Sequence, residues 1–469
     1  MIPVVTPDEM KAIDAAAPEP VDVLIGRAGA AVARVALDML GGAYGRRVVV
    51  IAGKGNNGAD GRDAAARLCR RGVRVQVADA ADGLRAVPAC DLVIDAAYGT
   101  GFRGEYDGPD AGDAPVLAVD IPSGVNGLNG EASPGAARAD VTVTFAALKP
   151  GLLLLPGGER AGRIELIDIG LDVSGATIHL VEAADVQAWL PTRPPESHKW
   201  RSAVWVVAGS PGMTGAAHLA ARAAMRAGAG MVHLGIPGLA GPERPEAGPG
   251  RPERPQALPE PPLEAVGRAL PEAGWDGTVL GELNRFRALL VGPGLGRAEM
   301  TGAAVRALVA SAPVPVIVDA DGLVALGDAA RAADVIAGRA HPTVLTPHDG
   351  EFAGLAAGTA PGADRIGAAR DLASTTGATV LLKGPTTVVA APDGRVLLEN
   401  EGDARLASAG TGDVLSGVVA AFLAQGLGGP EAAAAAAFVH ASAGNLGWRR
   451  GLVAGDLLDL LPAVLSRLD

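Results

Sequence analysis

The sequence predicts an α/β protein made of two domains, each built around a mostly parallel sheet. Short aliphatic and β-branched runs alternate with helical patterns along the 469 residues, as in βαβ units. The runs pass directly into glycine-bearing loops, which gather at one edge of a doubly wound sheet, where ligands bind. The alternation stops at the proline-rich stretch PTRPPESHKWRS, which begins at Pro191 and is typical of a domain boundary.

Composition narrows the class of protein before any motif is considered. The formal net charge of -12 argues against a broad basic surface for nucleic acid. The two cysteines lack a CxxC spacing, so neither a disulfide framework nor a thiolate metal site is indicated. The N-terminus does not resemble a secretory leader, and no apolar run reaches the roughly 18 residues of a membrane span. We therefore expect a cytoplasmic protein without nucleic-acid or membrane partners.

The first domain begins to alternate at RRVVVIAGKGNNGADG, residues 46–61, where a strand-like run breaks into a polar loop. The helical pattern RDAAARLCRRG follows, and VRVQVADA reads as the next strand, so these three segments form a βαβ unit. The alternation continues through DLVIDAAYGTGFRG, VLAVDIPSGVNG and ADVTVTFAALKPG. We expect residues 1–190 to form a Rossmann-like, doubly wound domain.

The strand ends of this first domain carry polar side chains that could converge on one ligand. Asn57 follows the first strand, Asp95 ends another, and Asp120 ends a third, with Ser123 just beyond it. Oxygen ligands without histidine or cysteine suit a hard cation, whereas a buried aspartate also suits acid or base chemistry. Spacing alone does not assign these roles. The glycines of GKGNNGADG match G-x-G-x-x-G, a weak signal in a glycine-rich chain.

The second alternating region begins with VWVVAGS, and we expect residues 196–469 to form the second domain. Its elements include MTGAAHLAARAAMRAGAG, RALLVGPGLG, VPVIVDADGL, TVLTPHDGEF and GATVLLKGPTTVVAAPDGRVLLEN. One stretch, residues 239–262, fits neither a strand nor a helix, because proline, glycine and charged residues dominate it. This composition predicts a mobile insert without a function of its own.

The motif AGTGDVLSG, residues 409–417, predicts an anion site near the end of the chain. Small residues let the backbone approach a ligand, and the first N–H groups of the following helix point outward with the positive end of its dipole. Asp413 would stand beside a bound phosphate and take a proton from an attacking hydroxyl. The alternative is an ordinary helix N-terminus with an acidic residue in its first turn.

Several long motifs, taken in order, resemble one known family. GNNGADG, DAAYGTGFRG and DIPSG resemble NAD(P)H-hydrate epimerase domains. PESHK, AGSPGMTGAAHLAARAAMRAGAG, GPGLG, TPHDGE, KGPTT and AGTGD resemble ADP-dependent NAD(P)H-hydrate dehydratase domains. Apart from the proline-rich insert, nearly the full chain is similar to the bifunctional nicotinamide nucleotide repair enzymes of bacteria. The resemblance implies a ribokinase-like second domain.

The reactions that the resemblance implies are epimerisation and dehydration of hydrated NADH or NADPH. The R and S hydrates (NADHX and NADPHX) would interconvert in the first domain. In the second, ADP would phosphorylate the hydroxyl of the S hydrate, and elimination would release AMP, phosphate and NAD(P)H. Phosphate is a good leaving group and hydroxide a poor one, so the phosphorylation has a clear chemical purpose. We also expect a homo-oligomer.

The resemblance assigns roles to individual residues of both domains. The substrate contacts implied in the first domain are Asn56, Asn57, Gly58, Ala59, Asp60, Gly99, Thr100, Gly101, Phe102, Arg103, Gly104, Glu105 and Asp120. The potassium ligands implied are Asn57, Asp95 and Ser123. In the second domain the implied base is Asp413, and the substrate contacts are Asp413, Ala216, Gly294 and His348. The ADP contacts implied are Lys383, Gly384, Pro385, Thr386, Thr387 and Gly412.

Some of these residues also have ordinary structural interpretations. Asp319 and Asp321 would hold a magnesium ion through water, or else cap a helix. Lys383 would bind phosphate, or else be a solvated surface charge. A lone histidine such as His348 is more often structural than a ligand contact.

The chain departs from the family pattern at a few positions, and two other functions compete with the family's. Ala59 replaces a glycine and adds a Cβ where close backbone approach or a positive φ is expected, which puts the epimerase half in question. Trp200 and Ala203 replace glycines of a second loop.

The competing functions are a ribokinase-like small-molecule kinase with a non-catalytic, nucleotide-binding N-terminal domain, and a scaffold protein. Transfer of label into a stable phosphorylated product would favour the kinase.

Overall fold

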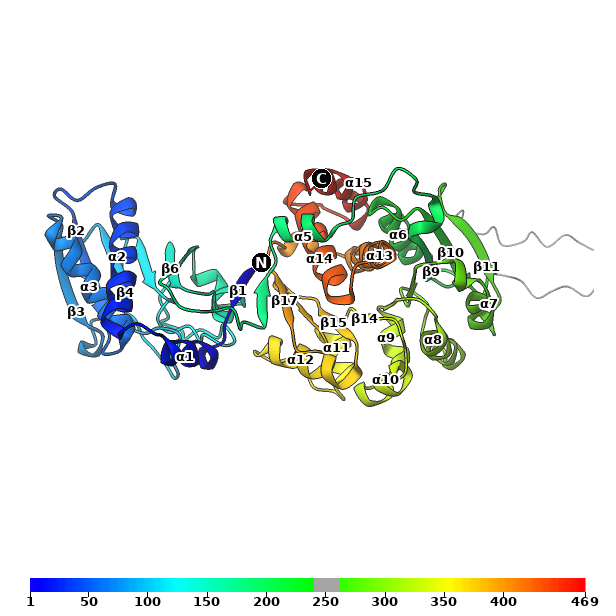
Figure 1. Ribbon diagram of the computed structural model, residues 1–469, viewed down its shortest axis with the longest axis horizontal. Coiled ribbons are helices and arrows are strands. Elements are labelled where there is room, and N and C mark those ends of the chain that lie inside the picture. Colours follow the sequence, from blue (N-terminus) through cyan, green and yellow to red (C-terminus); the bar gives the residue numbers. More distant parts are fainter. Residues whose placement is uncertain (240–261, 469) are drawn as a thin grey trace, which may run out of the picture. The chain divides into compact units, whose positions relative to one another are not determined.

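The computed structural model describes residues 1–239 and 262–468, which form two compact units (Figure 1). The N-terminal unit comprises Ile2–His179, and the C-terminal unit comprises Met1 and Leu180–Asp469. The division therefore falls at His179 rather than at residue 190, because Val181 and Val186 are buried in the core of the C-terminal unit. All but the two end residues of the predicted insert 239–262 lie outside the described residues.

The N-terminal unit contains a wholly parallel sheet in the order β3-β2-β4-β5-β6-β7. The strands are β2 (Arg47–Ala52), β3 (Arg74–Asp79), β4 (Leu92–Ala96), β5 (Val116–Val119), β6 (Val141–Phe145) and β7 (Arg163–Ile167). The chain runs from β2 to β3 on one side and then to β4 on the other, so the strand order reverses between β2 and β4. This reversal is the switch point at which doubly wound sheets bind ligands, as the sequence predicts.

Two helices of the N-terminal unit, α2 (Val21–Leu40) and α3 (Asn56–Arg70), pack against each other and against β4 (Figure 1). The loop before α3 requires glycine, because a Cβ on Gly53 would lie 1.9 Å from the carbonyl oxygen of Ala97. A Cβ on Gly58 would lie 1.9 Å from the carbonyl oxygen of Gly53. Ala59, in contrast, is an ordinary helical residue whose N–H donates to Gly55 O at 3.1 Å. The concern that position 59 needs a positive φ is therefore wrong.

The start of the chain returns to the sheet edge of the N-terminal unit. Short strand β1 (Ile2–Val4) lies beside Leu148, whose N–H donates to Pro3 O at 2.9 Å. Helix α1 (Pro7–Ala16) follows directly, and Thr6 and Glu9 form a capping box at its N-terminus. The anchored strand thus places α1 at the edge formed by the carboxyl ends of the strands. The remaining elements of this unit are α4 (Pro150–Leu153), η1 (Ala80–Asp82), η2 (Gly158–Arg160) and β8 (Ile178–Leu180), the last of which spans the division.

The C-terminal unit contains a mixed sheet in the order β17-β16-β15-β14-β13-β12-β9-β10-β11. Strands β9 to β15 pair with one another in parallel, and β16 and β17 are antiparallel to their neighbours. The strands are β9 (Ala203–Val207), β10 (Met231–Pro237), β11 (Val266–Leu270), β12 (Ala288–Val291), β13 (Val316–Val318), β14 (Thr343–Leu345), β15 (Thr379–Leu382), β16 (Thr387–Ala390) and β17 (Val396–Glu399).

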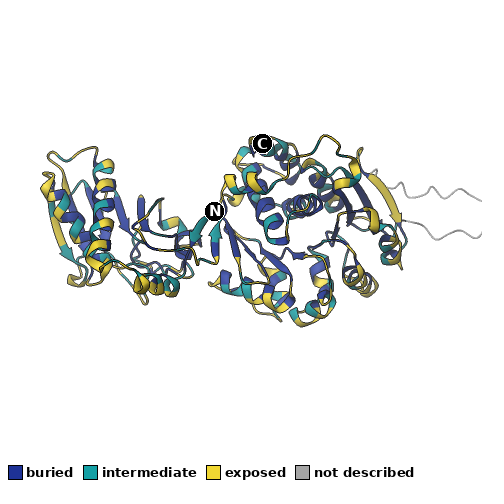
Figure 2. Ribbon diagram, in the orientation of Figure 1, coloured by how far each residue is buried: buried dark blue, intermediate teal, exposed yellow. Residues whose placement is uncertain are grey.

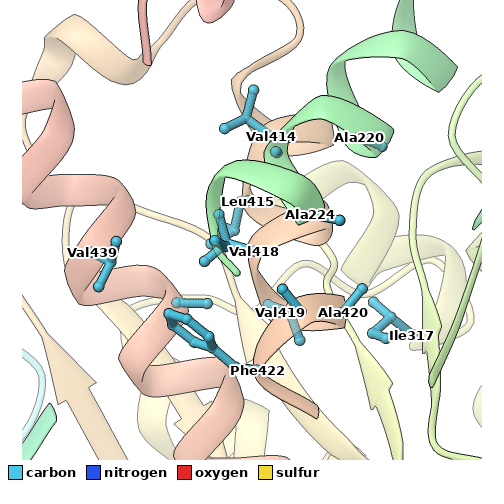
Figure 3. Close-up of a cluster of buried hydrophobic side chains, with 14 of the residues drawn as sticks. Ala220, Ala224, Ile317, Val414, Leu415, Val418, Val419, Ala420, Phe422 and Val439 are labelled. Atoms are coloured by element: carbon cyan, nitrogen blue, oxygen red, sulfur yellow. The ribbon is translucent and has the colours of Figure 1, made fainter. Parts of the chain in front are cut away.

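Helix α13 (Thr411–Ala424) forms the centre of this unit and packs on α6 (Gly215–Arg226) and α14 (Gly429–Leu446). All its residues from Val414 to Ala424 are buried (Figures 2 and 3). This burial is expected, because a helix with apolar side chains on every side has no face suited to water. A Cβ on Gly417 would lie 2.3 Å from the carbonyl oxygen of Ala220, so glycine allows the close crossing of α13 and α6. The helix that carries Asp413 is therefore rigidly held.

The other helices of the C-terminal unit are α5 (Ala183–Trp189), α7 (Trp275–Glu282), α8 (Glu299–Ser311), α9 (Asp321–Leu326), α10 (Ala329–Ile336), α11 (Asp349–Leu355), α12 (Arg365–Thr376) and α15 (Ala454–Leu468). Its short 3-10 turns are η3 (Lys199–Ser202), η4 (Leu283–Arg285) and η5 (Ala404–Leu406). Among the helices that the structure describes, none has the length and apolar character needed to cross a membrane.

Candidate active sites

A cleft of about 1090 Å³ opens at the carboxyl ends of the strands in the N-terminal unit. Helix α1, the start of α3 and the loops after β4, β5 and β6 line it. The sequence-predicted residues in its lining are Asn56, Asn57, Asp60, Gly99, Thr100, Gly101, Phe102, Arg103, Gly104 and Asp120. Among the described residues, Gly58, Ala59 and Glu105 are the predicted contacts outside this lining. The edge of the sheet thus gathers segments that are far apart in sequence.

A buried ion pair lies at the wall of this cleft. Lys149 is only 1% exposed, and its Nζ lies 2.7 Å from Asp120 Oδ1. The same ammonium donates to Thr144 Oγ1 at 2.9 Å and to Phe145 O at 3.0 Å, so all its protons have acceptors. The other oxygen of Asp120 accepts the N–H of Thr100 at 3.0 Å. Asp120 is consequently a fixed, fully engaged carboxylate.

The backbone around this ion pair is strained. Asp120 has φ 66° and Ala146 has φ 64°, and both directly follow neighbouring parallel strands, β5 and β6. Residues other than glycine pay for this left-handed conformation, and such residues cluster at functional sites. The strain is a second reason, independent of side-chain chemistry, to treat this part of the sheet edge as a candidate site.

Two further carboxyl groups line the cleft, and the pKa of each is raised. Burial, reinforced by Asp120, Asp63 and Asp14, raises the pKa of Asp60 to about 8. Burial and the charge of Asp120 also raise the pKa of Asp14, while Lys149 opposes this shift. Asp60 is thus largely a neutral carboxylic acid at physiological pH, and it can donate a proton.

The structure brings Asp95 and Ser123 into direct contact, and neither residue is part of the cleft lining. Ser123 donates its hydroxyl to Asp95 Oδ1 at 2.6 Å and its N–H to Asp95 Oδ2 at 2.7 Å. Burial raises the pKa of Asp95, and these hydrogen bonds counteract the shift. Both amide atoms of Asn57 are buried without a hydrogen-bond partner among the described residues. The oxygen of such an unpartnered amide is the kind of atom that coordinates a hard cation.

In the C-terminal unit, Asp413 lies in the first turn of α13, directly after the loop that ends with Gly410. Gly410 has φ 92°, and a Cβ there would lie 2.6 Å from Leu219 Cδ1, so the loop requires glycine. Burial raises the pKa of Asp413 to about 6; Asp319 and Glu351 add to the shift, and Lys383 opposes it. Asp413 is therefore mostly ionised at neutral pH and able to accept a proton.

Lys383 follows β15 and faces the same site. Its Nζ lies 3.0 Å from Asp319 Oδ1 and 3.5 Å from Glu351 Oε2. Burial disfavours the charged ammonium, but these two carboxylates outweigh burial and raise the pKa of Lys383. A Cβ on Gly412 would lie 3.5 Å from the same Nζ, so the KGPTT and AGTGD loops meet here. This geometry excludes the interpretation of Lys383 as a solvated surface charge.

Asp319 and Asp321 already have partners from the protein. Asp319 accepts the hydroxyl of Ser416 at 2.6 Å in addition to its bond with Lys383. Asp321 accepts the N–H of Gly296 at 2.9 Å and so holds the GPGLG loop. Among the residues with described positions, no group of three or more His, Cys, Asp or Glu side chains could hold a metal ion.

Two predicted substrate contacts lie side by side, whereas a third has a structural role. A Cβ on Gly294 would lie 3.4 Å from Ala216 Cβ, so these two residues are neighbours. His348 caps α11: its Nδ1 accepts the N–H groups of Gly350 at 3.0 Å and Glu351 at 3.3 Å. Its side chain remains 60% exposed, so the cap leaves the far ring edge accessible.

The predicted ADP loop is held in place by a residue that the sequence did not suggest. Arg365 donates to the carbonyl oxygen of Lys383 at 2.9 Å and to Asp349 at 2.9 Å. A Cβ on Gly384 would lie 2.7 Å from the Arg365 guanidinium. Within the loop, Thr386 and Thr387 are buried and Gly384 and Pro385 are exposed. The exposed glycine and proline leave the loop backbone open to a ligand.

Several other residues of the two sites were also missed by sequence reasoning. They are Asp14 and Lys149 in the N-terminal unit, and Glu351 and Ser416 in the C-terminal unit. Lys149 carried the clearest signal, because it is one of few lysines and stands just after a predicted strand. Asp14 carried none, since nothing in its helical segment indicates that α1 lies at the sheet edge.

Comparisons with known proteins cover both units. Residues 204–465 match the family model described as NAD(P)H-hydrate dehydratase, and residues 21–87 and 78–151 match that of the YjeF-related protein N-terminus. A bifunctional NAD(P)H-hydrate repair enzyme of Moorella thermoacetica is 37% identical over 90% of this chain and 88% of its own. One of Mycobacterium tuberculosis is 41% identical over 84% and 82%.

A solved structure also resembles the C-terminal part of the chain. The crystal structure of the ADP/ATP-dependent NAD(P)H-hydrate dehydratase of Bacillus subtilis, co-crystallised with ATP and Mg²⁺, is 32% identical. It covers 61% of this chain and 98% of its own, with a TM-score of 0.51. The ribokinase-like α/β fold expected for the second half is thereby confirmed.

Proposed function

The chain belongs to the family of bifunctional NAD(P)H-hydrate repair enzymes, and we propose how its two units divide the work. The N-terminal cleft epimerises the R and S hydrates, and the edge around Asp413 dehydrates the S hydrate. The observation that carries this division is the pair of separate polar sites, each at the carboxyl edge of its own sheet. The kinase and scaffold alternatives lose support, because the repair enzymes align with both units.

In the C-terminal unit, we propose that Asp413 takes the proton of the substrate hydroxyl as its oxygen attacks the terminal phosphorus of ADP. Lys383 and the first N–H groups of α13 stabilise the charge on the transferring phosphoryl group. The phosphate then leaves with the electrons of the C–O bond, and the neighbouring carbon loses a proton. The ring double bond is thereby restored, and AMP, phosphate and NAD(P)H are released.

Magnesium fits this site only as an indirectly held ion. Asp319 and Asp321 both accept hydrogen bonds from the protein, so they would hold magnesium through water, with phosphate oxygens completing its shell. The ion would supply charge neutralisation on the phosphates. ADP as the donor follows from the motif resemblance, and the similar Bacillus subtilis dehydratase is described as ADP/ATP-dependent.

In the N-terminal unit, we propose that Asn57, Asp95 and Ser123 hold a potassium ion. The support is the buried, unpartnered amide of Asn57 and the buried carboxylate of Asp95. The ion would balance the charge of the buried Asp95 carboxylate. Asp95→Asn should weaken the potassium dependence of epimerisation and the stabilisation of the protein by potassium together. Normal epimerisation without potassium would refute this site.

One assay tests both activities of the protein. The purified chain is added to a mixture of R and S NADH hydrates with ADP and magnesium, and the absorbance of the reduced nicotinamide ring is followed. A rise beyond the amount of S hydrate supplied requires both reactions. A rise that stops when the S hydrate is consumed would leave the N-terminal unit without its proposed activity. The homo-oligomer and the cytoplasmic location stay predictions.

A further inference from the structure

The chemistry of the hydrated ring limits how the N-terminal unit can epimerise it. Water adds to the ring double bond next to nitrogen, and the enamine carbon farther from nitrogen takes the proton. The hydroxyl therefore stands on the carbon bonded to nitrogen, which is the carbon that distinguishes R from S. The nitrogen lone pair can expel this hydroxyl once it is protonated. Epimerisation thus needs an acid on one face of the ring and a base on the other.

Resting on the proposed function of this unit, we propose that Asp60 and Asp14 are the acid and base of the epimerisation. Both line the cleft, from α3 and α1 respectively. The charge of Asp120 raises the pKa of both carboxyls, and the charge of Asp14 also raises the pKa of Asp60. The reaction then proceeds by loss and return of water rather than by ring opening.

Hydrogen bonding separates these two carboxyls from the third one in the cleft. Asp120 accepts from Lys149, Thr144 and Thr100, so both its oxygens are engaged. Within the described parts of the chain, neither Asp60 nor Asp14 has a side-chain hydrogen bond or an ion pair. They are the carboxyls free to exchange a proton with substrate, whereas Asp120 acts as a fixed negative charge.

Each step balances in atoms and electrons. As the C–O bond breaks, its electron pair goes to oxygen, the proton of Asp60 completes a water molecule, and the nitrogen lone pair forms an N=C bond. Water then attacks the opposite face of this planar cation, the N=C electrons return to nitrogen, and the carboxylate of Asp14 takes the proton. The reverse reaction exchanges the two roles. Proton exchange with solvent restores the starting state.

The charges around the cleft favour this cationic intermediate. Lys149 is the only ammonium buried beside these carboxyls among the described residues, and Asp120 neutralises it at 2.7 Å. Asp14 and the newly ionised Asp60 then provide the excess negative charge beside the cation. Fixed charges in a partly buried site stabilise a developing opposite charge more strongly than water does.

Isotope transfer from water tests the route directly. The full-length protein is incubated with S hydrate and potassium, without nucleotide, in ¹⁸O-labelled water. Chromatography measures the R hydrate formed, and mass spectrometry measures its label. We expect one ¹⁸O atom per epimerisation event after subtraction of the uncatalysed reaction. Epimerisation without label would overturn the inference, because it would show that the C–O bond stays intact. An absence of epimerisation would instead refute the function proposed for this unit.

Three variants identify the groups involved. Asp60→Asn and Asp14→Asn should each reduce kcat for epimerisation by about 10²–10⁴-fold, with a smaller effect on KM. Asp38→Asn is the matched control, because Asp38 is exposed near the end of α2 and outside this cleft. Dehydration of S hydrate by the same samples reports an intact protein. Retention of epimerisation and label exchange by Asp60→Asn, in a folded variant, would overturn its role.

Discussion

The two sites contain the same kinds of charged group, but the carboxyl group with the raised pKa is suited to donate a proton in one site and to accept a proton in the other. Each has a lysine paired with a buried or nearly buried aspartate, at 2.7 Å for Lys149 and Asp120 and at 3.0 Å for Lys383 and Asp319. Each also has a further carboxyl group with a raised pKa. That of Asp60 is about 8 and that of Asp413 is about 6.

The difference comes from where the lysine acts. Lys383 opposes the shift of Asp413, so this carboxyl ionises more easily than burial alone would allow. Lys149 is not among the groups that shift Asp60; the charges acting on that carboxyl, from Asp120, Asp63 and Asp14, are all negative. One carboxyl is therefore suited to accept a proton and the other to donate one. Burial is the largest cause of both shifts, and only Asp413 has a lysine that opposes it among the groups that act on these two carboxyls.

The largest expected effect comes from removing the base. Asp413→Asn keeps the size of the side chain but cannot accept the hydroxyl proton, so dehydration should fall about 10²–10⁴-fold. Epimerisation, which takes place in the other unit, should stay within twofold, or about 0.4 kcal/mol in barrier height. Both rates are measured on one sample of mixed hydrates. Dehydration at the normal rate would remove Asp413 from the mechanism.

Breaking the lysine pair of the C-terminal unit should have the next largest effect. Lys383→Met leaves Asp319 and Glu351 facing each other without a counter-charge, and loss of one partner of a buried pair costs about 3–5 kcal/mol. Chemical denaturation measures the loss. The double variant Lys383→Met with Asp319→Asn should regain part of the stability, because it removes the uncompensated charge. An unchanged unfolding midpoint in the single variant would contradict the pairing.

The pH dependence of the two reactions should then differ in sign. Dehydration needs ionised Asp413, so its rate should fall as the pH drops through about 6. Epimerisation needs protonated Asp60, so its rate should fall as the pH rises through about 8. Initial rates over a pH series with saturating substrate provide the test. If both rates declined on the same side, the contrast between the two carboxyls would be wrong.

The sequence predicted the strand-end residues better than the groups that surround them. Asn57 and Asp120 were singled out because each follows a strand of a parallel sheet, and Asp95 because it lies near the end of β4; the carboxyl ends of such strands share one edge. Asp14 was missed because its place depends on the packing of α1. Lys383 and Asp319 are 64 residues apart in sequence, and they pair because of the order of the strands in the sheet. Local sequence patterns do not reveal this order.

The domain division illustrates the same limit. The proline-rich stretch after Leu190 was the strongest local break, yet the C-terminal unit already begins at Leu180. Val186 on α5 is fully buried in the core of that unit, and this burial decides where the segment belongs. A short amphipathic helix does not indicate in its own sequence which of two cores it will join.

The smallest expected effect concerns the residue that first cast doubt on the N-terminal unit. Ala59→Gly restores the residue typical of the family, but Ala59 lies within α3 with normal helical hydrogen bonding. Glycine there should lower the stability by about 0.5–1 kcal/mol and leave epimerisation essentially unchanged. Thermal unfolding and the hydrate assay measure the two effects. A clear gain in epimerisation would mean that the Cβ of Ala59 obstructs substrate, and the site would then extend along α3 beyond the cleft.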